Sequence, residues 1–338
     1  MINVGIIGAG RIGKVHVESI NSAVSSATIK LLADPFMNDK TEAWAKERGV
    51  KAVTKDYHDI INDPEIDAVL ICSPTDTHYT VSLEAINAGK HVFCEKPVDH
   101  DLANIHEVME ALKQHPEVKY QVGFNRRFDH NYEALKAAVE SGKIGEPHVI
   151  KICSRDPEPA PIEYLKGSGG IFLDMSSHDF DMVRCLAGCN PVEIYAQGGV
   201  MVDPEIGKIG DVDTTMITIK MENGVLACID NSRQCSYGYD QRAEVFGSKG
   251  MASFGNDSQS DVRVSTKDGE NGEVALFFFL ERYMAAYTKE IKCFFETIEK
   301  NTDVPLGVED GLWSVVMGLA AQKSLEENRP VKISEIQM

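Results

Sequence analysis

Short apolar runs alternate with segments of helical apolar spacing over the first 124 residues of the chain. The apolar runs predict strands, which fall at residues 3–10, 28–35, 67–74, 91–97 and 119–124. The segments between them carry apolar residues at every third or fourth position and predict helices, at residues 12–22, 38–49, 77–90 and 102–115. Strands that alternate with helices in this way predict a parallel sheet with helices on both faces.

The pattern changes after about residue 124, where strands begin to follow one another directly. Helical spacing is confined to residues 131–142, 172–188, 283–300 and 309–328. The remaining apolar runs predict strands at residues 148–156, 192–201, 214–221, 224–233, 241–248, 250–254 and 262–266. Successive strands joined by turns such as Asn223-Gly224 predict a largely antiparallel sheet.

These patterns predict an α/β protein of two domains. Residues 1–124 form a doubly wound parallel sheet, and residues 125–338 form an α/β domain with a large, mainly antiparallel open sheet. The terminal helices carry apolar stripes and are expected to pack on one of the two domains, with the first domain as a candidate.

The net charge of -18 at pH 7 narrows the choice of partners. Nucleic acids and anionic membranes bind clustered Lys and Arg, so neither is an expected partner. The longest apolar patch, residues 275–280, is too short to cross a bilayer and fits a strand. The first residues lack the pattern of a signal peptide and the eight cysteines form no CxxC pair, which predicts a cytoplasmic protein with reduced thiols.

A glycine-rich turn lies between the first predicted strand and the first predicted helix. Residues 8–13 read GAGRIG, a GxGxxG pattern, and Asp34 follows 21 positions after Gly13 at the end of the second strand. This combination is the fingerprint of a dinucleotide site in a Rossmann domain. Gly8 permits the tight turn, Gly10 lets the backbone approach the pyrophosphate, and Gly13 lets helix and strand pack closely.

Asp34 favours NAD over NADP, because a carboxylate accepts hydrogen bonds from both ribose hydroxyls and repels a 2′-phosphate. No Arg stands at residues 35–37 to receive that phosphate. The first helical N–H groups, at Arg11 and Ile12, are expected to face the phosphates. FAD, which uses the same first turn, and a glycine turn in an unrelated α/β protein are lesser alternatives.

Further cofactor contacts are expected where the next core strand ends, since ligands of this fold bind at the carboxyl ends of its strands. Ser73 and Pro74 stand at that end, and Thr75 and His78 follow them. Thr75 can also serve as an ordinary helix N-cap without a role in binding.

The second candidate for chemistry is the segment at residues 173–181. On a helix, Asp174, His178 and Asp181 share one face, and an Asp one turn from a His can fix the ring tautomer and stabilise the protonated ring. A general base needs this arrangement. A helix-surface pair without function and a divalent metal site stay open as alternatives, although no further His lies nearby and hydride transfer to a nicotinamide needs no metal.

Together, these motifs resemble the Gfo/Idh/MocA family of NAD(P)-dependent sugar and polyol oxidoreductases. The resemblance covers nearly the whole chain and rests on GAGRIG at 8–13, ADP at 33–35, CEKP at 94–97, VGFNRRFD at 122–129 and DxxxH at 174–178. It implies an N-terminal Rossmann domain and a C-terminal α/β domain whose open sheet forms the subunit interface. A homo-oligomer, by family a homotetramer, is expected from this resemblance.

The resemblance also implies a mechanism. Lys96 lies beside the nicotinamide and hydrogen-bonds the reacting hydroxyl, and Glu95 is a further cofactor-binding residue. His178 takes the hydroxyl proton as hydride leaves the carbon, and Asp174 supports His178. The peptide before Pro97 is often cis in this family.

Within the family, the chain looks most like the inositol 2-dehydrogenases. GFNRRFD resembles their GFxRR segment, which implies that Asn125 and Arg126 lie near the substrate. Asp156 matches a polar position at the edge of their pocket, and SYGYD resembles their YGYD segment, which brings in Tyr237 and Tyr239. Strand packing is the alternative role of the two tyrosines.

The implied function is NAD-dependent oxidation of a secondary ring hydroxyl of myo-inositol to the 2-keto product, scyllo-inosose, as a step in polyol catabolism. Scyllo-inositol or an aldose such as glucose is the alternative substrate. A dinucleotide-binding sensor without catalysis is a further alternative, against which the intact Lys96, Asp174 and His178 argue. A metal-dependent hydrolase is a third, and no resident metal is expected.

Overall fold

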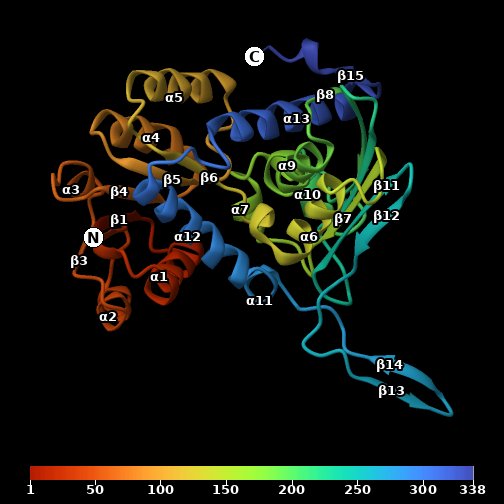
Figure 1. The fold of residues 1–338 in the computed structure, drawn as a ribbon, viewed down its shortest axis with the longest axis horizontal. Coiled ribbons are helices and arrows are strands. Elements are labelled where there is room, and N and C mark those ends of the chain that lie inside the picture. Colours follow the sequence, from red (N-terminus) through yellow and green to blue (C-terminus); the bar gives the residue numbers. More distant parts are fainter. Residues whose placement is uncertain (338) are drawn as a thin grey trace. The chain divides into compact units, whose positions relative to one another are not determined.

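Two sheets form the framework of the chain, one in each of two units (Figure 1). The structure is a computed structural model that describes residues 1–337. The first unit comprises residues 1–128 and 285–315, and the second comprises residues 129–284 and 316–337. We keep residues 1–124 and 125–338 as a proposed division of the sequence into domains.

The first unit is built on a six-stranded parallel sheet with the order β3-β2-β1-β4-β5-β6. Its strands are β1 (Ile2–Ile7), β2 (Ala27–Ala33), β3 (Ala52–Thr54), β4 (Ala68–Ile71), β5 (His91–Glu95) and β6 (Tyr120–Gly123). Its helices are α1 (Arg11–Ala23), α2 (Asp39–Glu47), α3 (His58–Ile61), α4 (His78–Asn87), α5 (Leu102–Gln114), the 3-10 helices η1 (Thr75–Thr77) and η2 (Asn125–Phe128), and nearly all of α12 (Met284–Lys300). This is the strand order of a doubly wound dinucleotide-binding sheet, so the predicted parallel sheet is confirmed.

The core of the first unit includes a helix from late in the chain. Ile291, Phe294 and Phe295 of α12 are buried in one apolar cluster with strand residues such as Val4 and Leu32. Burial of each of these side chains contributes about 1.5–3 kcal/mol relative to exposure. The α12 helix is therefore an integral layer of this unit.

The second unit is built on a seven-stranded sheet with the order β12-β11-β7-β10-β9-β8-β15. The strands are β7 (Pro147–Arg155), β8 (Pro191–Gly199), β9 (Thr214–Met221), β10 (Leu226–Ser232), β11 (Asp240–Gly247), β12 (Gly250–Phe254) and β15 (Val331–Lys332). Its helices are α6 (His130–Glu140), α7 (Ile162–Leu165), α8 (Gly170–Asp174), α9 (Ser176–Ala187), α10 (Pro204–Lys208), α11 (Phe279–Arg282), the later part of α13 (Val308–Glu327) and the 3-10 helix η3 (Ile333–Glu335). All neighbouring strands are antiparallel except β7 and β10, which are parallel, so the mainly antiparallel sheet is confirmed.

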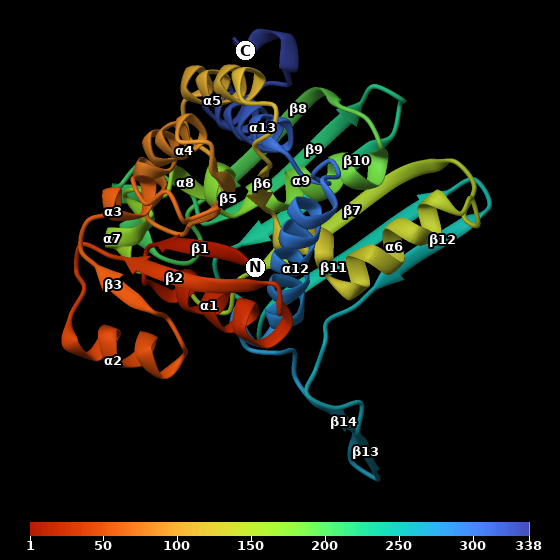
Figure 2. The same ribbon diagram turned by 60° about the vertical axis from the view of Figure 1, so that its left-hand side comes forward.

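The two faces of this sheet differ. Helices α6 and α9 pack on one face (Figure 2). Burial alternates along the strands, as in β9, so every second side chain points away from these helices. We call the face that these side chains form the outer sheet face; four large apolar residues on it are about half exposed, namely Met216, Leu226, Phe246 and Met251.

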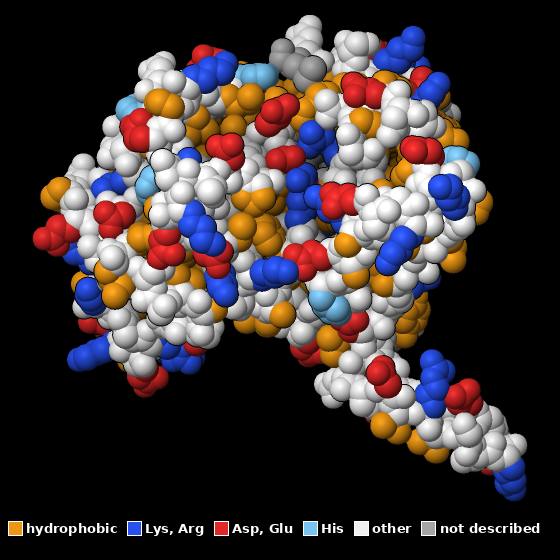
Figure 3. Space-filling model, in the orientation of Figure 1, with side chains coloured by type: hydrophobic (Ala, Val, Ile, Leu, Met, Phe, Trp, Pro, Cys, Tyr) orange, Lys and Arg blue, Asp and Glu red, His pale blue; other side chains and the backbone are white. Residues whose placement is uncertain are grey.

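Two predicted strands differ from the structure. The strand expected at 275–280 is wrong, because α11 begins at Phe279 and the ring of Phe278 packs edge-on against Tyr239. The strand at 262–266 exists as β13 (Arg263–Thr266), but it pairs with β14 (Gly269–Gly272) in a separate hairpin. Figure 3 shows this projecting hairpin with apolar and charged side chains on its surface.

Candidate active site

The glycine turn after β1 has the geometry that its spacing predicts. Gly8 has a φ of 102°, and a Cβ on it would lie 2.6 Å from the carbonyl oxygen of Cys72. A Cβ on Gly13 would lie 2.0 Å from the carbonyl oxygen of Gly8, so helix and turn approach too closely for a side chain. A Cβ on Gly10 would meet nothing within 4 Å. The backbone at Gly10 is therefore open to a ligand.

The N-terminus of α1 is suited to an anion. Gly10 is its N-cap and makes no side-chain capping bond, and the first turn contains no acidic residue. Arg11 is exposed and Ile12 is half-buried at this end. The N-terminus of a helix presents N–H groups and the positive end of the helix dipole, and no acidic side chain of the first turn competes with an anion here, which fits the pyrophosphate of a dinucleotide.

Asp34 lies directly after β2 and is bonded to the glycine turn. Its Oδ2 accepts a hydrogen bond from the N–H of Ala9 at 2.7 Å, and its Oδ1 accepts one from the N–H of Phe36 at 2.8 Å. Each carboxylate oxygen retains a lone pair for a ribose hydroxyl. The bond to Ala9 is a contact that the sequence pattern alone did not reveal.

The turn after β4 contains Ser73, Pro74 and Thr75, as predicted. The Ser73 hydroxyl lies 2.6 Å from the hydroxyl of Thr77, which also donates to the carbonyl of Pro74 at 2.7 Å. Thr75 begins η1, and the N-cap of α4 is Thr77. Thr75 is therefore not the N-cap of α4, while its contact with a cofactor stays a prediction.

β5 ends at Glu95, and Lys96 begins the turn that follows it. Glu95 Oε1 lies 2.6 Å from Nε2 of His16, a fully buried residue of α1. Lys96 is half-buried, and the peptide bond between Lys96 and Pro97 is cis. His16 was missed by the sequence reasoning, because its position in α1 gives no sign of its contact with β5.

His78 is buried between these two turns, with 2% of its surface exposed. Its Nδ1 lies 2.7 Å from the carbonyl oxygen of Pro97, and its Nε2 lies 2.8 Å from that of Ser73. The structure therefore brings His78 together with the segments that carry Ser73 and Lys96. The same sheet edge continues at β6, after which Asn125 and Arg126 stand in η2, each 2% exposed.

In the second unit, the predicted helix at 172–188 forms as α8 and α9, separated by Met175. Every residue from Ile171 to Val183 is buried except Asp174 and His178. Asp181, expected on the same face, is only 1% exposed. The structure thus presents one carboxylate and one imidazole from an otherwise buried helical segment.

Asp174 is held by two residues that the sequence reasoning missed. The Tyr164 hydroxyl donates to Oδ1 at 3.0 Å, and Nη1 of Arg233 donates to Oδ2 at 3.3 Å. Arg233 is 1% exposed, and its Nη2 also lies 3.6 Å from Asp211. Burial first, and then the charge of Asp174, raises the pKa of Tyr164, so its hydroxyl stays a donor. The sequence did contain one sign of this role, because Arg233 is a charged residue at the end of the apolar strand predicted at residues 224–233.

The two predicted tyrosines occupy different surroundings. Tyr237 is 44% exposed, and its hydroxyl donates to Asp240 at 2.7 Å, which raises the pKa of Tyr237 to about 12. Tyr239 is 8% exposed and packs edge-on against Phe278 and Tyr283. Tyr239 thus packs in an aromatic cluster just before β11 (Asp240–Gly247), outside any strand, and substrate contact by either ring stays a prediction.

Asp156 follows β7, where its N–H donates to the carbonyl of Ser232 at 3.0 Å. The side chain is half-buried. No group of three or more His, Cys, Asp and Glu able to hold a metal ion occurs within residues 1–337. Over the same range, no helix is long and apolar enough to cross a membrane.

Comparison with known proteins matches both parts of the chain to one family. Residues 2–124 match the model of the oxidoreductase family with an NAD-binding Rossmann fold, and residues 132–253 match the GFO/IDH/MocA C-terminal domain. An uncharacterized oxidoreductase of Bacillus subtilis is 48% identical over 97% of this chain and 96% of its own. The myo-inositol 2-dehydrogenase of Thermotoga maritima is 44% identical over 99% of each chain.

One similar solved structure contains both a cofactor and a substrate. The scyllo-inositol dehydrogenase from Lactobacillus casei, with bound NAD(H) and scyllo-inositol, superimposes with a TM-score of 0.92. It is 33% identical, and the match covers 99% of both chains. The fold of the chain thus recurs in a protein of known structure.

Proposed function

The chain belongs to the GFO/IDH/MocA family of oxidoreductases, and we propose that it oxidises myo-inositol to the 2-keto product, scyllo-inosose. It is an NAD-dependent dehydrogenase, and the proposal concerns its substrate and its catalytic residues. The substrate is supported by the 44% identity to the myo-inositol 2-dehydrogenase of Thermotoga maritima. The proposed chemistry rests on one observation: Asp174 and His178 are only partly buried, whereas the other residues of this helical segment are buried.

The residues of the first unit fit the proposed cofactor contacts. The open backbone at Gly10 and the N-terminus of α1 would hold the pyrophosphate, and Asp34 would accept hydrogen bonds from the ribose hydroxyls. Bound NAD supplies the acceptor for the hydride. Ser73, Pro74, Thr75, Glu95 and Lys96 complete the proposed contacts around the cofactor.

The proposed proton chemistry uses three side chains. Lys96 donates a hydrogen bond to the oxygen of the reacting hydroxyl and stabilises the negative charge that develops there. His178 accepts the hydroxyl proton as the C–H bond gives its electron pair and hydrogen away as hydride, and a C=O bond forms. Asp174 orients the ring of His178. The contacts of Tyr164 and Arg233 with both oxygens of Asp174 support this positioning.

The substrate contacts are proposed for a ring that carries many hydroxyl groups. Polar groups that lose water on binding need partners, and this favours a site rich in polar side chains. The residues proposed for this role are Asn125, Arg126, Asp156, Tyr237 and Tyr239. Scyllo-inositol is the second candidate substrate, because the Lactobacillus casei relative binds it at 33% identity.

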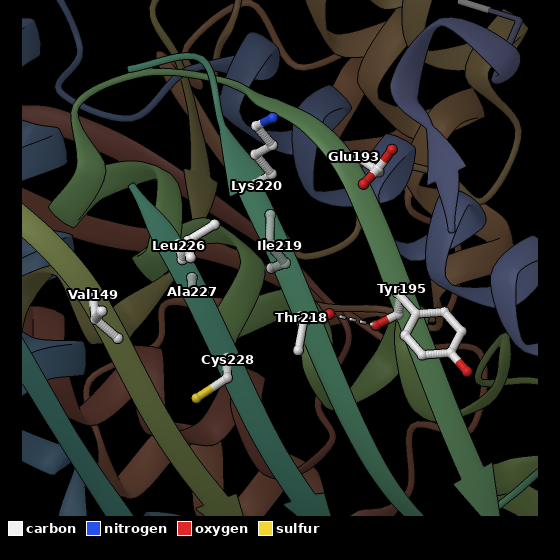
Figure 4. Close-up of a pocket in the computed structure, with 9 residues that line it drawn as sticks. All are labelled: Val149, Glu193, Tyr195, Thr218, Ile219, Lys220, Leu226, Ala227 and Cys228. Atoms are coloured by element: carbon white, nitrogen blue, oxygen red, sulfur yellow. Dashed lines mark hydrogen bonds between the residues drawn. The ribbon is translucent and has the colours of Figure 1, made fainter. Parts of the chain in front are cut away.

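We also propose that the protein is a homotetramer that works in polyol catabolism in the cytoplasm. The outer sheet face supports the oligomer, since four large apolar residues on it are about half exposed. One of them, Leu226, lines a pocket on this face (Figure 4). The pocket is lined by Val149, Glu193, Tyr195, Thr218, Ile219, Lys220, Leu226, Ala227 and Cys228. All eight cysteines are free thiols, which supports a reducing compartment.

A substrate panel tests the proposal. The purified protein is incubated with myo-inositol, scyllo-inositol, other inositol isomers and glucose, each with NAD and with NADP. We expect reduced cofactor to form fastest with myo-inositol and NAD. A faster reaction with scyllo-inositol would replace the substrate with the second candidate, and no reaction with any inositol would refute the substrate class.

A further inference from the structure

Both ring nitrogens of His78 are hydrogen-bonded to backbone carbonyl oxygens, which can only accept. His78 is the first residue of α4, and its side chain lies between the turn after β4 and the turn after β5. Nδ1 lies 2.7 Å from the carbonyl oxygen of Pro97, and Nε2 lies 2.8 Å from the carbonyl oxygen of Ser73. At these distances both contacts are hydrogen bonds of full strength.

A neutral imidazole cannot make both bonds. It carries one N–H and one lone pair, and a backbone carbonyl oxygen only accepts. In a neutral ring, one nitrogen lone pair would face a carbonyl lone pair at less than 3 Å, in a site without solvent. Such a buried and unsatisfied contact is unfavourable. Only the protonated ring satisfies both carbonyl oxygens.

We infer that His78 is an imidazolium at neutral pH, and that its two N–H groups tie the turn of Lys96 to the turn of Ser73. The bonds join the residue directly after Lys96 to the residue directly before Pro74. His78 is thus a positioning residue. Its role in catalysis rests on the proposed function of Lys96, whereas its protonation state follows from the ring contacts alone.

The groups that act on the ring come from three segments. Burial alone would lower the pKa of His78, but the sulphur of Cys94 in β5 and the carbonyl groups of Pro97 and Ser73 outweigh it and raise the pKa to about 9. The buried phenol of Tyr120 also interacts with Cys94 and donates to or accepts from the Ser82 hydroxyl at 3.0 Å. The raised pKa of His78 thus agrees with its ring contacts, which require the protonated ring.

One consequence concerns the pH dependence of the enzyme. An ordinary histidine changes charge near pH 6.5, which would make and break the contact between the two turns in the physiological range. An imidazolium that persists to about pH 9 keeps the two turns joined over this range.

The protonation state is tested by nitrogen NMR of the histidine rings in the wild-type protein without substrate. His91 is the internal control, because its Nδ1 accepts a hydrogen bond from the N–H of Lys119 at 3.1 Å and burial lowers its pKa. We expect both ring nitrogens of His78 to be protonated at pH 7 to 8, and His91 to be protonated on Nε2 only. A His78 ring with one unprotonated nitrogen at pH 7 would overturn the inference.

Assignment uses His78→Gln and His91→Gln. If His78→Gln does not fold, His58→Gln removes the signal of an exposed ring whose pKa is also raised. In that variant the ring of His78 is assigned through its proximity to Pro97 and Ser73, and it is still expected to be doubly protonated at pH 8. No such signal would refute the inference. The spectra need no substrate, so this result is independent of whether inositol is oxidised.

Turnover tests the positioning role. The amide of His78→Gln has both N–H donors on one nitrogen and an acceptor oxygen in place of the second, so it cannot reproduce the two separate donor nitrogens of the imidazolium. His78→Gln should therefore lower kcat about ten- to a hundredfold through misplacement of Lys96. The Kd for NAD should change less than about threefold, and His91→Gln should leave kcat within about twofold of the wild type. Unchanged kcat in a folded His78→Gln protein would refute the positioning role.

Discussion

Asp34 accepts a hydrogen bond from the backbone N–H of Ala9 at 2.7 Å, so the acidic residue of the dinucleotide fingerprint is fixed to the glycine turn itself. The proposed ribose-binding group and the proposed pyrophosphate-binding turn are therefore positioned together. This arrangement explains why the spacing between them is restricted: the end of β2 must lie beside the turn that follows β1.

Asp34→Asn should weaken the binding of NAD and reduce discrimination against NADP. Hydrogen bonds to a charged acceptor contribute about 1.5–3 kcal/mol, so the Kd for NAD should rise about ten- to a hundredfold. Calorimetric titration with each cofactor measures both effects. Asp39→Asn, an exposed change in α2, is the control and should leave both affinities unchanged. An unaltered NAD to NADP preference in Asp34→Asn would contradict the role of the carboxylate.

Arg233→Met should destabilise the second unit and lower turnover. The guanidinium is 1% exposed and pairs with Asp174, and loss of one partner of a buried ion pair costs about 3–5 kcal/mol. Chemical denaturation measures the loss. The control is Arg263→Met in the exposed β13–β14 hairpin, where a distant pair with Glu270 should contribute about 0–1 kcal/mol. Equal unfolding midpoints for the two variants would show that the buried pair does not stabilise the unit.

Asp213 should give the second unit a pH-dependent contribution to stability. Burial opposes ionisation, but the N–H groups of Met201, Asp203 and Val202 donate to the carboxylate and hold its pKa below the usual value. Because the pKa of Asp213 is lower in the folded state than in the unfolded state, the ionised carboxylate stabilises the fold at pH values above the unfolded-state pKa of about 3.9. This contribution is lost as the pH falls through the folded-state pKa.

The test compares Asp213→Asn with the wild type by denaturation at a series of pH values. The variant should be less stable at pH 7, and the difference should shrink below about pH 4. Asp268→Asn, in the exposed loop between β13 and β14, should show little difference at neutral pH. A stability difference for Asp213→Asn that is constant from pH 7 to pH 3 would be inconsistent with this account.

Leu226→Glu should dissociate the proposed tetramer. Leu226 lies on the outer sheet face with 53% of its surface exposed, and a carboxylate without a partner would be costly to bury in an interface. Light scattering of the eluted protein gives the mass of the assembly. Met201→Glu, at a residue 78% exposed outside the sheet, should leave the mass unchanged. An intact assembly in Leu226→Glu would remove this face from the interface.

Much of the fold follows from local pattern. The alternation of strand and helix predicted the parallel sheet, because each βα unit buries its own apolar stripe. The glycine turn and Asp34 were also predictable from local sequence, because the backbone geometry of a short segment fixes the positions of both. The strand expected at 275–280 failed, because the segment makes only an isolated bridge at Ala275, Phe278 packs against Tyr239, and α11 begins at Phe279.

The contacts that support the candidate site could not be predicted in this way. Arg233 is 59 residues from Asp174 in sequence, and it meets Asp174 and Tyr164 only through the packing of α7, α8 and the segment directly after β10. The sequence showed that His78 is present but not that it is buried between two carbonyl oxygens. Such contacts depend on tertiary packing, which no local spacing encodes.

The most direct test of the proposed reaction follows the hydrogen that leaves the substrate. Myo-inositol that carries deuterium on the carbon to be oxidised is incubated with NAD and the wild-type protein, and the reduced cofactor is analysed by mass spectrometry. Lys96→Met is the matched variant, and its rate should fall by a factor of about 10²–10⁴ while NAD still binds. We predict that the reduced cofactor carries the deuterium and that scyllo-inosose forms in equal amount. Reduced cofactor without deuterium, or a Lys96→Met variant as fast as the wild type, would contradict the account.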